Sequence, residues 1–176
     1  DYPQIDVHNL HHNAPIVAET CFALLLTAAK AIVPIDRTFR KHDWSPRYVH
    51  DRPGVMLAGR TVLILGYGDI GGRVAAYCRV FGMNVLGIKR TLPPDAPNFL
   101  HTPDALHDLL PQTDVLIIAV PATPETESMI GATELAMLRE KAILVNIGRA
   151  SVVDEEAFFL ALQSGQLHAA AADVWY

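Results

Sequence analysis

A glycine-rich turn between an apolar strand and a helix constrains this chain more than any other feature. Residues 66–71 read Gly-Tyr-Gly-Asp-Ile-Gly and follow residues 61–65 (TVLIL), a β-branched run typical of a buried parallel strand. The first glycine allows a tight turn, the second lets the backbone approach a pyrophosphate, and the third lets helix and strand pack closely. The helix that follows would offer free N–H groups and its positive dipole end to phosphates. Such a turn can be purely structural, but in this position it predicts dinucleotide binding by Gly66, Tyr67, Gly68, Asp69 and Ile70.

Strands and helices alternate along the rest of the chain. Further strands are expected at residues 84–88, 114–120, 142–147 and 167–172, with helices at 70–81, 103–110, 133–139 and 154–164. Alternation at this spacing predicts βαβ units, right-handed crossovers and a parallel sheet. The predicted fold class is therefore α/β, a doubly wound parallel sheet of the Rossmann type. Before it, apolar residues at helical spacing predict one long helix over residues 14–39, and residues 41–59 have the composition of a loop.

Composition narrows the classes of partner. The 176 residues suffice for one domain, 51% are apolar, and the net charge is −5 without a dense Lys/Arg cluster, which disfavours nucleic acid. The longest apolar run, residues 21–29, is too short to span a bilayer, so we expect no membrane and a cytoplasmic protein. Cys21 and Cys78 lie in apolar helical stretches and are expected to be buried reduced thiols.

The end of the second strand bears on the choice of cofactor. NAD sites usually have an acidic residue here to hold the ribose 2′-hydroxyl, whereas this chain has Lys89, Arg90 and Thr91 and no carboxylate until Asp95. The two cations and the hydroxyl could bind a 2′-phosphate, which an acid would repel. The alternative is that both cations are solvated strand-end charges. We predict NADP as the preferred cofactor, with NAD possible.

Arg149 is the candidate for chemistry among the residues that follow the other strands. A guanidinium at a strand end beside the nicotinamide could clamp a substrate carboxylate bidentately and polarise its 2-oxo group. The structural alternative is an ion pair with a nearby carboxylate such as Asp154. Asp154, Glu155 and Glu156 are themselves expected to cap a helix, because acids favour its N-terminal dipole.

Taken together, five ordered motifs resemble the D-isomer-specific 2-hydroxyacid dehydrogenase family. They are VAET at 17–20, LGYGDIG at 65–71, VPATPETESMI at 120–130, LVNIGRASVVDEEA at 144–157 and AAADVW at 170–175. The resemblance covers almost the whole chain, and it implies an NAD(P)-dependent oxidoreductase that acts on small 2-oxo or 2-hydroxy acids. Residues 89–91 resemble the NADPH-linked glyoxylate/hydroxypyruvate reductases of the family. One departure is Ala150, where the family usually has glycine after the catalytic arginine.

The resemblance also implies roles for single residues. Arg149 would be the catalytic arginine that binds substrate, and it would also contact the cofactor. Asp173 would hydrogen-bond the nicotinamide carboxamide, while Ile147 and Gly148 would line the nicotinamide. The adenosine side would be flanked by Val120, Pro121 and Thr126, and Thr20 would touch the cofactor from the hinge helix.

The family pattern implies one domain of a two-domain enzyme. Residues 1–13 would be a linker from a substrate domain, 14–58 a hinge helix and arm, and 59–176 a dinucleotide-binding domain shortened at its C-terminal end. The family's catalytic Glu and its acid/base His fall beyond Tyr176, so the chain alone is expected to bind cofactor and to transfer little or no hydride. His8, His11 and His12 match no standard ligand spacing and are expected in a solvated linker, so no metal site is predicted.

For the parent enzyme we expect NADPH-dependent reduction of glyoxylate, hydroxypyruvate or a similar 2-oxo acid to the D-2-hydroxy acid. A homodimer is expected, with Trp44 packed in an arm. The alternative from another class is a dinucleotide-sensing interaction module of the corepressor type, which some relatives of the family represent. Within the enzyme class, D-3-phosphoglycerate and formate dehydrogenases remain open.

Overall fold

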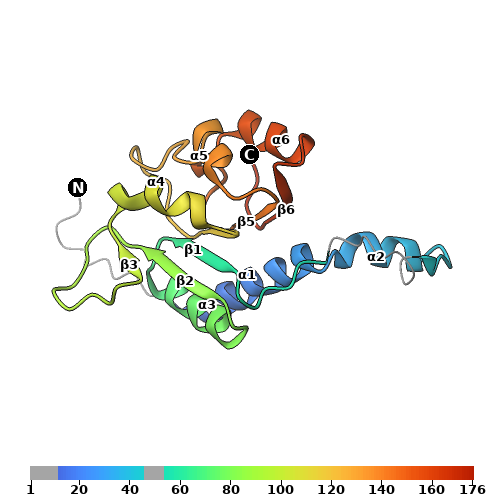
Figure 1. The fold of residues 1–176 in the computed structure, drawn as a ribbon, viewed down its shortest axis with the longest axis horizontal. Helices are drawn as coiled ribbons and strands as arrows, with labels where there is room; N and C mark the ends of the chain where they lie inside the picture. The colour runs from blue at the N-terminus through green and yellow to red at the C-terminus, as the bar shows by residue number, and fades with distance from the viewer. Residues whose placement is uncertain (1–11, 46–53) are drawn as a thin grey trace, which may run out of the picture.

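A six-stranded parallel sheet forms the centre of the molecule in the computed structural model, which describes residues 12–45 and 54–176 (Figure 1). The strand order is β3-β2-β1-β4-β5-β6, the doubly wound order in which the chain reverses direction across the sheet between β1 and β4. The strands are β1 (Thr61–Leu65), β2 (Asn84–Ile88), β3 (Leu100–His101), β4 (Val115–Ile118), β5 (Ala142–Asn146) and β6 (Leu167–Ala172).

Helices cover both faces of the sheet. On one face lie α1 (Ala14–Ala29) and α3 (Asp69–Val80), and on the other α4 (Leu106–Leu109), α5 (Ala132–Met137) and α6 (Glu155–Gln163) (Figure 1). Alternate residues of β1 serve the two cores: Val62 and Ile64 pack with α1 and α3, whereas Leu63 and Leu65 pack on the opposite side. Burial on both faces explains why the strands are continuous apolar runs. Short 3₁₀ turns occur at Pro103–Ala105, Leu110–Gln112 and Ala150–Val152.

The expectation of one long helix over residues 14–39 is wrong. The chain forms α1 and then α2 (Ile32–Phe39), with Ala31 between them at a φ of 51°. Pro34 explains the break, because in a continuous helix its ring would clash with the carbonyl of Lys30. α2 leads away from the sheet (Figure 1). Among the described residues no single helix is long and apolar enough to cross a membrane, and α1 and α2 pass that test only as a pair bent by 65°.

The predicted strands are largely confirmed. β1, β2 and β6 have the expected bounds, β5 is one residue shorter, and β4 is shorter at both ends. The two-residue strand β3 was not expected. It is defined by main-chain bonds to β2, in which Gly87 and Lys89 donate to the carbonyls of Phe99 and His101 at 2.8 and 2.9 Å.

The structure also bears on the predictions made for the cysteines, for Trp44 and for the histidines near the N-terminus. Cys21 and Cys78 are free and fully buried, as predicted. Trp44 packs on Phe39 with ring centroids 4.8 Å apart, and 60% of its surface is exposed. His8, His11 and residues 46–53 of the predicted loop lie outside the described residues, and the described residues contain no cluster of potential metal ligands.

Candidate functional site

Five loops meet at the carboxyl edge of the sheet, because all the strands are parallel. They follow β1, β2, β4, β5 and β6 and contain nearly all the residues predicted to bind cofactor or substrate. In open α/β sheets, ligands lie beyond this edge at the point where the strand order reverses, here between β1 and β4.

The glycines of the turn after β1 have distinct packing environments. Gly66 has a φ of 103°, and a Cβ there would lie 2.7 Å from the carbonyl oxygen of Ala119, at the end of β4. A Cβ on Gly71 would overlap the carbonyl oxygen of Gly66. By contrast, nothing lies within 4 Å of a Cβ placed on Gly68. The first and third glycines therefore serve packing, whereas the second leaves open space in front of the backbone.

The start of α3 carries donors without intrahelical partners. The N–H groups of Asp69, Ile70 and Gly71 are the first three of the helix, and no side chain among the described residues caps them. Gly68, at the N-cap, places no side chain in front of them. Three free N–H groups at the positive end of a twelve-residue helix fit a pyrophosphate.

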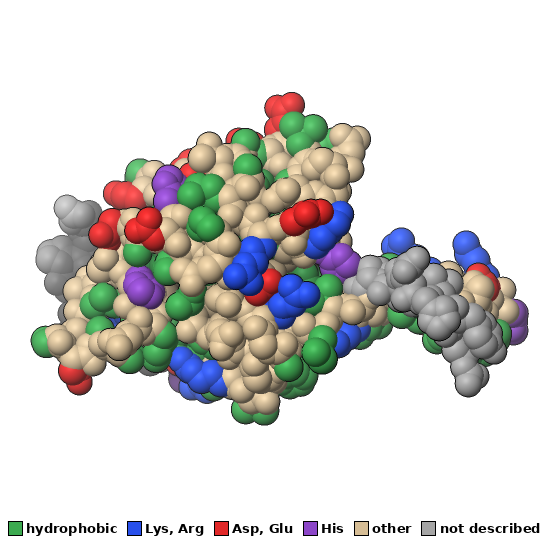
Figure 2. Space-filling view, viewed as in Figure 1, with side chains coloured by type: hydrophobic (Ala, Val, Ile, Leu, Met, Phe, Trp, Pro, Cys, Tyr) green, Lys and Arg blue, Asp and Glu red, His purple; other side chains and the backbone are tan. Residues whose placement is uncertain are grey.

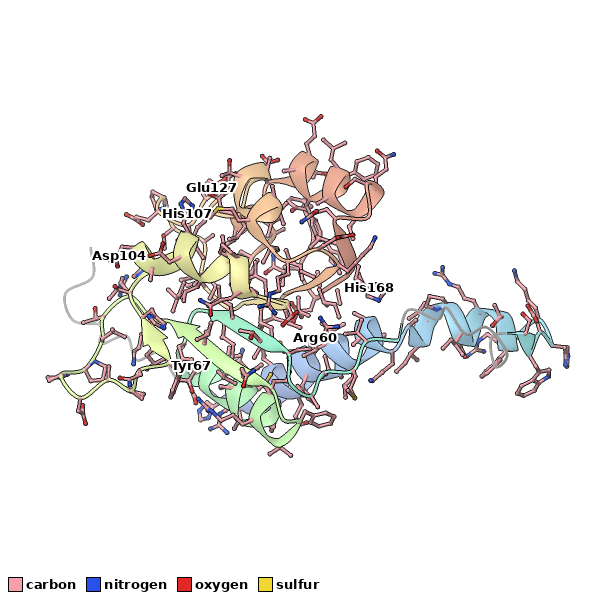
Figure 3. All side chains as sticks on the ribbon, viewed as in Figure 1. Arg60, Tyr67, Asp104, His107, Glu127 and His168 are labelled. Atoms are coloured by element: carbon pink, nitrogen blue, oxygen red, sulfur yellow. The ribbon has the colours of Figure 1, made fainter. Side chains whose placement is uncertain are left out.

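Both the main chain and the side chain of Tyr67 contact the β2–β3 region. Its N–H donates to the carbonyl of Ile88 at 2.7 Å, so this donor is already used. Its ring packs 5.6 Å from Phe99 and occupies the space that a side chain on Gly87 would need (Figure 3). Arg79 lies 3.4 Å from its hydroxyl. The Tyr67 side chain thus connects the turn to β2 and β3.

The loop after β2 presents the predicted basic segment. Lys89, Arg90 and Thr91 are exposed, and the Lys89 N–H is fixed by the carbonyl of His101 at 2.9 Å. The pKa of Glu125, in the loop after β4, is lowered first by a hydrogen bond from Thr123 and more weakly by the charge of Arg90. The charge of Arg90 thus acts on the loop after β4 at long range.

The loop after β5 presents Arg149. Arg149 is exposed, and its guanidinium donates to the carbonyl of the preceding residue, Gly148, at 2.7 Å. The alternative ion pair with Asp154 is not formed in the part of the chain that the structure describes. Instead, the Asp154 carboxylate accepts from the N–H of Ala157 at 2.8 Å and caps α6, as expected.

Asn146, which was not among the predicted site residues, holds this loop in place. Its side-chain oxygen accepts from the Gly148 N–H and its side-chain nitrogen donates to the Arg149 carbonyl, both at 3.0 Å. It is the last residue of β5 and is only 4% exposed. An Asn directly after an apolar strand run and two residues before a glycine is the sequence signal, because Asn side chains commonly bond the backbone two residues on.

Two other predicted residues, Thr126 and Asp173, lie on the adjoining loops, whereas Thr20 lies in α1. Thr126 donates to the carbonyl of Pro121 at 2.7 Å and accepts from the Thr123 N–H at 2.8 Å, so its hydroxyl orders the loop after β4. Asp173 is exposed just after β6, and its N–H donates to the Asn146 carbonyl at 3.2 Å. The hydroxyl of Thr20 donates to the carbonyl of Ile16 within α1.

The remaining predicted residues follow β4 and β5. Val120 is half-buried and Pro121 is exposed at the start of the loop after β4. Ile147, directly after β5, is 7% exposed and belongs to the core. A Cβ on Gly148 would lie 2.5 Å from the carbonyl oxygen of Val120, so the loops after β4 and β5 touch at this glycine.

A charged cluster of Arg60, Asp114 and Arg139 lies at the opposite, amino-terminal edge of the sheet. Asp114, 6% exposed, accepts from Arg60 at 2.9 Å, from Arg139 at 3.1 Å and from the Thr61 N–H at 2.8 Å. Burial opposes the charged carboxylate, but these hydrogen bonds and charges outweigh it and lower the pKa of Asp114. Figure 2 shows Lys and Arg side chains gathered around acidic atoms near the middle of this view, where Figure 3 labels Arg60. One buried carboxylate is thus held by two arginines, and we interpret the cluster as structural.

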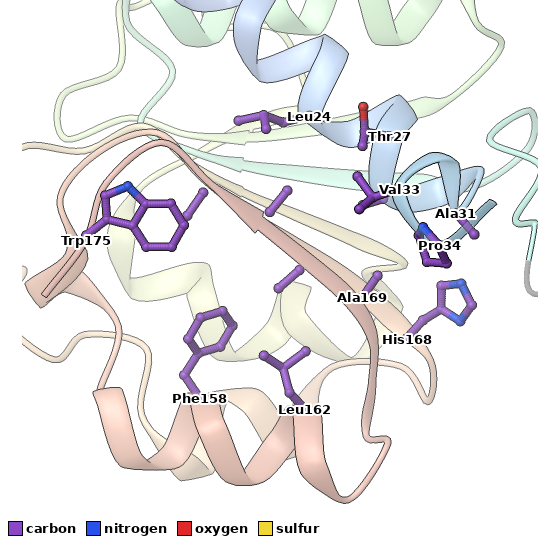
Figure 4. A pocket seen from close by; sticks show the side chains of 14 residues that line it. Leu24, Thr27, Ala31, Val33, Pro34, Phe158, Leu162, His168, Ala169 and Trp175 are labelled. Carbon is purple, nitrogen blue, oxygen red and sulfur yellow. The ribbon is translucent and has the colours of Figure 1, made fainter. Parts of the chain in front are cut away.

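An apolar groove of about 720 Å³ lies along the outer side of β6, between the α1–α2 region and α6. Leu24, Val33, Phe158, Leu162 and Trp175 contribute its larger side chains (Figure 4). None of the predicted site residues lines it. The groove is therefore separate from the candidate site.

Comparison with known proteins decides the family. Residues 22–176 match the family model described as D-isomer specific 2-hydroxyacid dehydrogenase, NAD binding domain. The chain belongs to this family. The resemblance inferred from the five motifs is thereby confirmed, and so is the doubly wound α/β fold of an NAD-binding domain.

Individual 2-hydroxyacid dehydrogenases are similar over most of this chain. A glyoxylate reductase of Thermococcus gammatolerans is 37% identical over a 163-residue alignment that covers 90% of this chain and 49% of that protein. A glycerate dehydrogenase of Methylorubrum extorquens is 35% identical over 97% of this chain and 52% of its own length. The structure of a D-isomer specific 2-hydroxyacid dehydrogenase from Xanthobacter autotrophicus in complex with NADPH and MES has a TM-score of 0.80 and 31% identity, covering 99% of this chain and 72% of that one. The chain spans about half the length of the curated relatives it matches.

Proposed function

We propose that this chain is the cofactor-binding part of an NADPH-dependent reductase that converts a small 2-oxo acid, such as glyoxylate or hydroxypyruvate, into the D-2-hydroxy acid. The observation that carries the proposal is the arrangement at one edge of the sheet. There the uncapped start of α3 lies between the basic segment after β2 and the guanidinium of Arg149 after β5, which forms no ion pair with any described residue. The names of the similar proteins, glyoxylate reductase and glycerate dehydrogenase, point to the same class of substrate.

The basic segment supports NADPH over NADH. Lys89 and Arg90 are exposed at the end of β2, where a NAD site usually has its ribose-binding acid. A 2′-phosphate is negatively charged, so a Lys and an Arg can both bind it, the Arg through two parallel hydrogen bonds. The similar structure from Xanthobacter autotrophicus is in complex with NADPH.

Each candidate group has a distinct task in this proposal. The N–H groups of Asp69, Ile70 and Gly71 hold the pyrophosphate, and Asp173 orients the nicotinamide by accepting from its carboxamide. Arg149 binds the substrate carboxylate and polarises its 2-oxo group, which favours negative charge developing on that oxygen. The bound cofactor supplies the hydride.

Calorimetric titration with NADPH and, separately, NADH tests the cofactor choice. We expect NADPH to bind at least tenfold more tightly, about 1.4 kcal/mol. Lys89→Ala and Arg90→Ala should each reduce that preference, whereas Lys41→Ala, an exposed cation at the end of α2, should leave it unchanged. A preference for NADH in the wild type would contradict the 2′-phosphate argument and leave the family assignment intact.

Turnover by the natural full-length protein tests the reaction. We expect reduction of glyoxylate or hydroxypyruvate with NADPH, and a loss of at least a hundredfold in kcat/KM for Arg149→Ala, since one charge-stabilising donor contributes about 2.7–4 kcal/mol. Cofactor binding without turnover on any 2-oxo acid of a panel would favour the dinucleotide-sensing module instead. Location in the cytoplasm and a homodimer remain predictions.

A further inference from the structure

Two of the loops at the carboxyl edge, those after β5 and β6, are bonded to one buried residue, Asn146. Its side chain bonds the N–H of Gly148 and the carbonyl of Arg149, each at 3.0 Å. Its main-chain carbonyl accepts the N–H of Asp173 at 3.2 Å, which ties the loop after β6 to the same residue. The next N–H, of Ile147, donates to the carbonyl of Ile118 at the end of β4.

The two side-chain bonds require a residue that is both donor and acceptor. A carboxamide has one oxygen that accepts and one NH₂ that donates, whereas a carboxylate only accepts and an aliphatic side chain does neither. Asp in this position could still accept from Gly148, but its second oxygen would face the Arg149 carbonyl. Leu would leave the buried Gly148 N–H without this acceptor, and it would leave the Arg149 carbonyl with the Val152 N–H, at 3.2 Å, as its donor.

The Arg149 side chain does not fix its own loop. Its guanidinium is exposed and contacts the carbonyl of Gly148, a neighbour in the same loop. On the other side, Gly148 lies against the carbonyl of Val120, which leaves no room for a side chain. The backbone from which Arg149 projects is therefore held by the bonds that Asn146 makes, by this close contact and by the bond from the Val152 N–H to the Arg149 carbonyl.

We propose that Asn146 is a positioning residue, whose side chain sets the Arg149 loop for the nicotinamide half of the cofactor and takes no part in binding the adenosine half. The proposal rests on the proposed function for the identity of the ligand. It differs from a stabilising role, because its effect is confined to one end of the dinucleotide. The adenosine half is assigned to other elements, the loops after β2 and β4.

The test uses Asn146→Leu and Asn146→Asp in this chain, with Thr113→Val as the matched control. Thr113 is also fully buried and its hydroxyl donates to the Leu109 carbonyl at 2.9 Å, but it lies at the opposite edge of the sheet. The probes are NADPH and adenosine 2′,5′-bisphosphate, which lacks the nicotinamide. Calorimetry gives both affinities, dihydronicotinamide fluorescence reports the environment of the ring, and amide hydrogen exchange reports the Gly148 bond.

For both Asn146 variants we expect NADPH affinity to fall at least tenfold and the fluorescence change on binding to be lost, with the affinity for adenosine 2′,5′-bisphosphate within twofold of wild type. Thr113→Val should lower stability and keep both affinities. Equal losses for the two probes, or no loss for NADPH, would overturn the proposal.

Amide exchange separates this proposal from the proposed function. Exchange at Gly148 should be at least tenfold faster in Asn146→Leu, and slow in Asn146→Asp, which retains the acceptor. If the wild type bound neither probe, the proposed function would fail, and exchange alone would then decide whether Asn146 positions the loop. Unchanged exchange at Gly148 in Asn146→Leu would overturn that role.

Discussion

Three alanine substitutions in the turn after β1 should separate folding from cofactor binding. Gly68, Gly71 and Gly72 lie within five residues, yet an added methyl group meets a different environment at each. At Gly68 it meets nothing within 4 Å, at Gly71 it overlaps the carbonyl oxygen of Gly66, and at Gly72 it makes ordinary contact with Tyr67 at 3.7 Å.

The expected stabilities follow from these contacts. Gly68→Ala should cost less than about 1 kcal/mol, because alanine is only a poorer N-cap than glycine. Gly72→Ala should stabilise by about 0.5–1 kcal/mol, the propensity difference in a helix. Gly71 lies in the same helix and gains the same propensity, but forcing a methyl against backbone costs about 1–3 kcal/mol or more. Gly71→Ala should therefore be clearly less stable than Gly72→Ala.

The order of the three variants in NADPH affinity should differ from their order in stability. The methyl of Gly68→Ala enters the open space in front of the uncapped N–H groups of α3, so NADPH affinity should fall at least tenfold in a protein of nearly normal stability. Gly72→Ala should bind as the wild type does. Urea unfolding and calorimetric titration of the three variants measure both quantities. Unchanged NADPH affinity in Gly68→Ala would refute the assignment of this open space to the pyrophosphate.

Three further outcomes follow from the structure. The lowered pKa of Asp114 means that its contribution to stability is present above its unfolded pKa of about 3.9 and is lost as the pH falls through its lower folded value; Asp114→Asn should therefore flatten the acid limb of a stability–pH curve measured by urea unfolding. Asp154→Ala should cost about 1 kcal/mol of unfolding free energy by removing the α6 cap, and a loss below 0.3 kcal/mol would contradict that role. Burial is the main cause that raises the pKa of the Cys21 and Cys78 thiols, so a colorimetric thiol reagent should react with neither in the folded chain and with both in urea; fast reaction without denaturant would contradict their placement.

Local sequence predicted the sheet well because its strands are buried on both faces. The run TVLIL at β1 is apolar after Thr61 and ends at a glycine, so both its type and its bounds can be predicted. β3 could not be predicted in this way, because two residues have no periodicity and the strand is defined by its bonds to β2. The break before α2 was missed although Pro34 was a visible signal, since the apolar spacing continues across it.

In the candidate site, too, some features could be predicted from local sequence and others could not. Residues whose role depends on backbone approach, such as Gly66 and Gly71, could be inferred from a motif in its strand–helix setting. The role of Asn146 depends on where its amide meets Gly148 and the Arg149 carbonyl, and only the folded loop shows this. The orientation of Tyr67 toward Phe99 likewise depends on the contact between the turn and β3.

The most direct test of cofactor binding at this edge of the sheet is an amide NMR titration of the chain with NADPH. We expect the largest shifts at Asp69, Ile70 and Gly71, with a second group at Gly148 and Asp173, and none at Thr113 on the opposite edge. Shifts concentrated at Thr113 or along the groove beside β6, or no shifts at millimolar NADPH, would contradict the proposed site.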